Sequence, residues 1–124
     1  MASEKQINEQ FEKMANDIPG FIAASLVDME SGMTLGLKSN RPDFDLAAAS
    51  AYNSEMVKQK MKIMRALNLK SNLEDMLITL TDQIHLLKFL PGDTSFLYLA
   101  ADRAGTNLAI LRNSVNKNVA ALAA

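Results

Sequence analysis

The 124-residue chain contains no cysteine, one histidine, three prolines and five glycines. Without cysteine, a disulfide framework, a thiolate metal site and a thiol nucleophile are excluded. A single histidine would need several converging carboxylates to complete a metal site, and the sequence does not show such a set. No apolar run approaches the roughly 20 residues of a membrane helix, and the polar N-terminus lacks the pattern of a signal peptide. We therefore expect a cytoplasmic protein without a metal or another cofactor.

Charge of either sign is present without a marked excess. Thirteen Lys and Arg residues face 14 Asp and Glu residues, for a formal net charge of -1. This balance gives no attraction for phosphate backbones or anionic lipid, so we expect neither nucleic acid nor a membrane among the partners. The length, and the lack of repeats and of linkers rich in Gly, Pro or Ser, predict a single domain over residues 1–124.

Hydrophobic periodicity predicts three helices. Apolar residues at helical spacing over about residues 3–17 indicate an amphipathic helix that ends at Pro19-Gly20. Helix formers without Gly or Pro fill Phe44 to Leu69, where Asp43 and Asp45 are expected to cap the N-terminus. The last helix presents a single apolar face, formed by Leu108, Leu111, Val115, Val119 and Leu122.

Short apolar or alternating runs bounded by turn residues predict five strands. Their approximate ranges are Phe21–Met29, Met33–Leu37, Met76–Thr81, Ile84–Leu90 and Phe96–Ala101, with a turn at Pro91-Gly92-Asp93-Thr94 before the last. The order α-β-β-α-β-β-β-α predicts an α/β fold, a three-layer α-β-α sandwich around one five-stranded antiparallel sheet. The long helix would cover one face of the sheet, and the two terminal helices the other.

Two features of this arrangement suggest contacts beyond the single chain. An open sheet has two edges, and an edge is a pairing site unless something blunts it. On the long helix, an apolar band roughly 160° wide at about 100° per residue exceeds what one flat sheet needs. The band consists of Met56, Val57, Met61, Ile63, Met64 and Leu67.

Residues that could carry chemistry are few. No nucleophile elbow, phosphate loop, dinucleotide fingerprint or zinc spacing occurs, and no acid–base set converges, so we expect no enzyme. His85 alternates with apolar residues on a predicted strand, which is typical of a satisfied or exposed strand histidine. Lys58, Lys62 and Arg65 form a basic strip at i, i+4 and i+7 of the long helix, either a solvated face or a partner contact.

Several stretches, in their order and spacing, carry a family resemblance. The first stretch is Ile18-Pro19-Gly20-Phe21 with residues 24–28, and the second is the turn at Ser31-Gly32. The others are residues 73–81 with 83–86, residues 96–101 and residues 107–112. Over about residues 5–121 the chain resembles the roadblock (dynein light chain) family, in particular its stand-alone prokaryotic members. That resemblance implies a homodimer in which the third strands pair edge to edge into one ten-stranded sheet, with the long helices packed over the seam. The implied dimer-interface residues are Val57, Met61, Met64, Met76, Ile78 and Leu80.

Members of this family bind small Ras-like GTPases, as activators, as scaffolds or as dynein subunits. The resemblance therefore implies a non-enzymatic interaction module that binds and regulates or scaffolds a small Ras-like GTPase, with Lys58, Lys62 and Arg65 as candidate partner-binding residues. The alternative is a PAS-like small-ligand sensor, which also joins two strands to three through a helical crossover. A single long helix in that crossover favours the roadblock arrangement.

Overall fold

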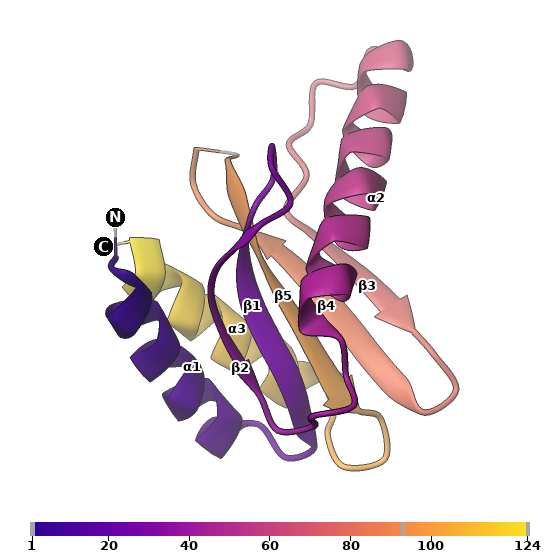
Figure 1. Cartoon of the computed structure of the whole chain (residues 1–124). Coiled ribbons are helices and arrows are strands. Elements are labelled where there is room, and N and C mark those ends of the chain that lie inside the picture. The colour runs from indigo at the N-terminus through magenta and orange to yellow at the C-terminus, as the bar shows by residue number, and fades with distance from the viewer. Residues whose placement is uncertain (1, 93, 124) are drawn as a thin grey trace.

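Three helices and five strands follow one another in the order predicted from the sequence (Figure 1). The computed structural model describes residues 2–92 and 94–123, so Asp93 of the predicted last turn lies outside the described residues. The elements are α1 (Glu4–Asp17), β1 (Phe21–Asp28), β2 (Thr34–Ser39), α2 (Leu46–Ala66), β3 (Asp75–Thr79), β4 (Gln83–Phe89), β5 (Ser95–Asp102) and α3 (Leu108–Ala123). The long helix is shorter at both ends than Phe44–Leu69, and Leu80 lies just after β3.

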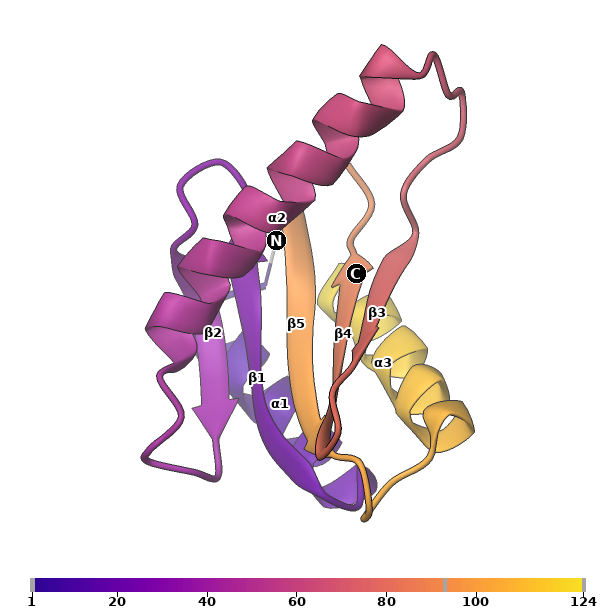
Figure 2. The same cartoon turned by 90° about the vertical axis from the view of Figure 1, so that its right-hand side faces the viewer.

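The five strands form one sheet in the order β2-β1-β5-β4-β3, and every neighbouring pair is antiparallel. β1 and β5 are central and almost fully buried, which explains their nearly continuous apolar sequences. β2 and β3 form the two edges. Figure 2 shows α2 crossing one face of the sheet while α1 and α3 lie behind it, which confirms the predicted three layers.

Each face of the sheet has its own core. Ile7, Phe11 and Met14 of α1 pack with the inward residues of α3 on one face. On the other face, Val57 of α2 packs against sheet residues that include Tyr98. The alternation of side chains along the strands divides the sheet between these two cores.

The crossover between β2 and β3 contains one continuous helix of 21 residues, as predicted. Asp45 is its N-cap, because its carboxylate accepts the Ala48 N–H at 3.0 Å. Asp43 does not cap the helix as expected. It is exposed and forms an ion pair with Arg41 at 3.3 Å, and the Arg41 hydrogen bond lowers the pKa of Asp43.

The sheet fully buries α2 side chains only as far as Val57, and beyond it the half-buried Met61 still packs against the edge of that core. The buried residues of α2 are Leu46, Ser50, Ser54 and Val57, and none of the residues from Lys58 to Ala66 is buried. The hydroxyls of Ser50 and Ser25 lie 2.9 Å apart, so small side chains let the first half of the helix approach β1 closely. The second half extends past the end of the sheet (Figure 2). None of the helices in the described residues is long and apolar enough to cross a membrane.

Candidate interaction surface

The outer side of β3 is an open strand edge. β3 pairs with β4 in regular register, and just beyond it the Leu80 N–H donates to the Gln83 carbonyl at 2.8 Å. Because hydrogen-bonded and non-hydrogen-bonded pairs alternate in an antiparallel ladder, the N–H groups of Asp75, Leu77 and Thr79 point away from β4. In the described residues β4 is the only strand paired with β3. This edge can therefore accept a further strand.

The three central side chains of β3, Met76, Leu77 and Ile78, are apolar but incompletely covered. Met76 packs against the core beneath α2, and the half-buried Ile78 shares that face by alternation. Leu77 points to the opposite face and is 37% exposed, and Leu80 after the strand is 40% exposed. Strand edges with such apolar residues favour association over solvation.

The overhanging half of α2 adds further apolar surface. Met61 and Met64 are half-buried, and Leu67 after the helix is 64% exposed. A cleft of about 150 Å³ lies between this half of the helix and the segment that leads to β3. Met61, Met64, Leu69 and Leu73 provide its apolar lining.

The six predicted interface residues differ in how far their side chains are exposed. Met61, Met64, Met76 and Ile78 are half-buried and Leu80 is exposed, so these five have surface to offer a partner. Val57 is 0% exposed. It lies where α2 still covers the sheet, so it belongs to the core and has no surface to offer a partner.

The basic strip is likewise divided. The Lys58 ammonium donates to the Glu30 carbonyl at 2.9 Å and lies 3.7 Å from the Glu55 carboxylate. Lys58 therefore fastens α2 to the turn between β1 and β2, whereas Lys62 and Arg65 are exposed. A second cleft of about 360 Å³ adjoins this part of the helix. It is lined by Asp28, Met29, Glu30, Lys58, Met61, Arg65 and Thr94.

His85 is held by neighbours on the sheet, as its alternating pattern predicted. Its Nδ1 lies 3.2 Å from the Tyr98 hydroxyl, and its Nε2 lies 2.7 Å from the Gln83 side-chain oxygen. Burial lowers the pKa of His85 and raises the pKa of Tyr98 to about 12, so both side chains favour their neutral forms. The hydrogen-bonded cluster of His85, Tyr98 and Gln83 is therefore part of the packing of the sheet. Among the described residues, no group of three or more acidic or histidine side chains could hold a metal ion.

One contact that supports β3 was missed by sequence reasoning. The Arg112 guanidinium of α3 donates to the Asp75 carboxylate at 2.7 Å, which ties the helix to the first residue of the edge strand. The two residues are 37 positions apart, so no spacing rule links them. Only the packing of α3 behind β4 brings them together.

Solved structures with the same architecture are found, although no protein-family model and no curated protein matches the sequence. MglB of Myxococcus xanthus is 14% identical, covers 99% of this chain and 89% of its own, and superposes with a TM-score of 0.87. The gliding protein MglB of Thermus thermophilus is 16% identical, with 99% and 90% covered and a TM-score of 0.84. A Roadblock/LC7 domain from Streptomyces avermitilis is 14% identical, with 93% and 92% covered and a TM-score of 0.80.

These similarities extend over nearly the full length of each structure, although the sequences are only 14–16% identical. The shared feature is the complete arrangement of three helices around one five-stranded sheet. The chain has the roadblock fold.

Proposed function

We propose that the chain is a roadblock-family protein that acts as a homodimer. The observation that carries this proposal is the open edge of β3 beside the overhanging half of α2. Pairing of two β3 strands would give the outward N–H groups of Leu77 and Thr79 partners and extend the sheet to ten strands. The same step would bury the apolar surface of Met61 and Met64 against the partner's helix.

We further propose that this dimer binds a small Ras-like GTPase and regulates or scaffolds it without catalysing a reaction itself. Support comes from the likeness in fold to MglB and to a Roadblock/LC7 domain, together with the family resemblance of the sequence. The exposed Lys62 and Arg65 on α2 are the candidate contacts. Activation would require the dimer to favour a competent conformation of the GTPase, since differential binding is what shifts such an equilibrium.

Capture from a lysate of the source organism tests the partner. The immobilised protein is incubated with lysate containing GDP or a non-hydrolysable GTP analogue, and retained proteins are identified by mass spectrometry. A GTPase so found is then purified and titrated against the free protein in each nucleotide state. Preference for one state supports regulation, and equal binding of both supports a scaffold.

The binding surface is tested by charge reversal on opposite sides of the molecule. Lys62→Glu with Arg65→Glu should abolish GTPase binding and leave the mass and stability of the protein unchanged. The matched control is Lys5→Glu with Lys13→Glu, which reverses two exposed charges on α1, on the other side of the sheet. Full binding by the α2 variant would remove these residues from the proposed site. Absence of any GTPase from both captures would contradict the proposed partner.

A further inference from the structure

The second edge of the sheet, β2, differs from β3 in whether its outward-pointing backbone N–H groups have hydrogen-bond partners. Beyond the strand the Asn40 N–H donates to the Ile22 carbonyl at 2.8 Å. By the alternation of antiparallel pairs, the N–H groups of Leu37 and Ser39 therefore point away from β1. On an unprotected edge these groups would be free to bind a further strand.

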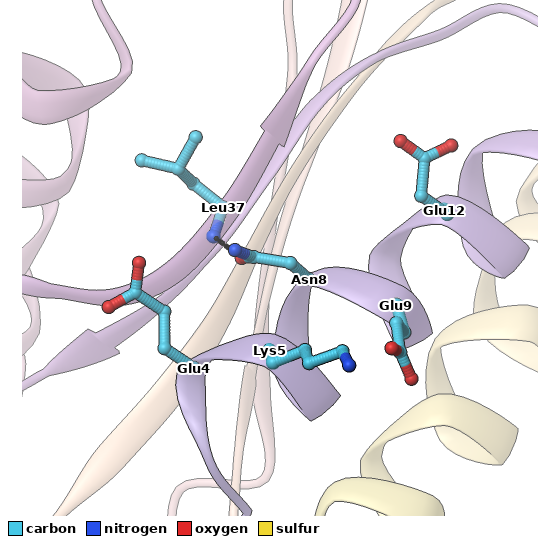
Figure 3. Close-up of a pocket in the computed structure, with 6 residues that line it drawn as sticks. All are labelled: Glu4, Lys5, Asn8, Glu9, Glu12 and Leu37. Carbon is cyan, nitrogen blue, oxygen red and sulfur yellow. Dashed lines mark hydrogen bonds between the residues drawn. The ribbon is translucent and has the colours of Figure 1, made fainter.

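The Leu37 N–H is instead already bound within the chain. The side-chain oxygen of Asn8 accepts it at 2.8 Å (Figure 3). Figure 3 shows Asn8 reaching from α1 to the backbone of β2. In an antiparallel ladder, the carbonyl of an added strand would have to take the position of the Asn8 oxygen. An amide side chain thus replaces the backbone partner that an added strand would supply.

Gly36 makes this approach of α1 possible. A Cβ atom at Gly36 would lie 2.8 Å from the Cβ of Ile7 and closer still to its Cγ2, and 3.1 Å from the Asn8 oxygen. Carbon atoms in contact prefer separations of about 3.5–4.0 Å. The glycine therefore lets the helix lie against the edge strand at a depth that no larger residue permits.

Two further features blunt the same edge. The pairing of β1 with β2 shifts register between Leu26 and Val27, which leaves Leu35 as the extra residue of a bulge. Lys38 carries a charge on the strand and forms an ion pair with Glu12 of α1 at 2.9 Å. Bulges and edge lysines are common means by which proteins prevent strand addition. β3 has a regular register and no lysine over its five described residues, and its one charged side chain, Asp75, lies at the start of the strand, where it is paired with Arg112.

We propose that Asn8 of α1 is a specificity-determining residue for assembly: it seals the β2 edge, so that a second chain can add only at β3. This inference rests on the β3 dimer of the proposed function and adds the reason why assembly stops there. A chain with two pairing edges would add neighbours at both and assemble beyond two copies, into a ring or an open filament. A chain with one open edge closes at two copies.

The test compares three variants of the full chain with the wild type. Asn8→Ala removes the acceptor and frees the Leu37 N–H, whereas Asn8→Asp retains an acceptor in the same place. Asn16→Ala is the matched control, since Asn16 is an exposed residue of the same helix. Light scattering after size-exclusion chromatography gives the mass over a hundredfold range of concentration. Amide hydrogen exchange at Leu37, measured at the lowest concentration, reports the hydrogen bond itself.

We expect Asn8→Ala to exchange the Leu37 amide about fivefold faster or more than the wild type does, as loss of one hydrogen bond implies. Its mass should rise with concentration above that of the wild type, and Asn8→Asp and Asn16→Ala should follow the wild type in both measurements. An unchanged mass with faster exchange would overturn the proposal, and so would unchanged exchange. A wild type that is a single chain would contradict the β3 dimer, whereas association of Asn8→Ala alone would still support the sealed edge.

Discussion

Replacing Gly36 by alanine tests how closely α1 approaches β2. The added methyl carbon would lie 2.8 Å from the Cβ of Ile7 and nearer to its Cγ2. Ile7 is 2% exposed and packed in the core of α1 and α3, so it has no free space into which to move. The backbone of α1 or the Ile7 rotamer must therefore shift.

The expected cost follows from two opposing effects. Overpacking of a filled core destabilises by about 1–3 kcal/mol, whereas replacing glycine by alanine restricts the unfolded chain and stabilises by about 0.4–1 kcal/mol. The net loss should be about 1–2 kcal/mol in the free energy of unfolding. For a domain of this length that corresponds to a fall in Tm of roughly 3–10 °C.

Urea unfolding of four proteins completes the test: the wild type, Gly36→Ala, Ile7→Ala and the double variant. Ile7→Ala alone should cost about 2–4 kcal/mol through the cavity that it creates. In the double variant the methyl carbon at position 36 no longer meets Cγ2, and only the contact with the Cβ of residue 7 remains. The combined loss should therefore be smaller than the two single losses added, by about 1 kcal/mol. A Gly36→Ala protein as stable as the wild type, or strictly additive losses, would refute the close packing of α1 on β2.

Two further predictions concern the sheet and the long helix. Burial should give His85, the single histidine, a pKa below the ordinary 6.5 when it is measured by NMR. Because the unfolded chain then binds the proton more readily, the free energy of unfolding should fall as the pH drops from 6.5 to that lowered pKa. His85→Gln should lack this dependence. An imidazole that titrates at or above 6.5 would contradict the account of its burial. Asp45→Ala removes the N-cap of α2 and should cost about 1 kcal/mol in thermal or urea unfolding, whereas Asp43→Ala should be nearly neutral; equal effects of the two would contradict the assignment of the cap.

Most of the fold could be predicted because its signals are local. The periodicities of 3.6 and 2, and breakers such as Pro19-Gly20, determine the type and order of the elements. The wide apolar band of α2 correctly indicated surface that the sheet does not cover. What the sequence does not contain is the place where the sheet ends beneath the helix. Val57 and Met61 therefore look equivalent by angle, although only Val57 is fully buried.

The difference between the two edges could not be predicted for a related reason. The Asn8–Leu37 contact spans 29 positions and depends on the position of α1 relative to β2, which no local pattern encodes. Gly36 offered the only local signal, since a glycine inside a strand often marks a close approach of another segment. Its meaning becomes visible only once Ile7 is seen to occupy the space above it.

Proline substitutions at two neighbouring positions of β3 separate the proposed contact between two β3 strands from the stability of the single chain. Leu77 directs its N–H to the open edge, so Leu77→Pro should preserve the pairing with β4 and the stability of the single chain. The N–H of Ile78 faces β4 by the same alternation, so Ile78→Pro should destabilise the fold itself. Circular dichroism and urea unfolding separate these two effects.

The solution mass of the wild type and of Leu77→Pro tests the central claim most directly. By light scattering, the wild type should have about twice the 13.6 kDa mass of one chain, independent of concentration in the micromolar range. Leu77→Pro should be folded and have the mass of one chain. A wild type with the mass of one chain, or a folded Leu77→Pro that remains a dimer, would contradict a seam formed by β3.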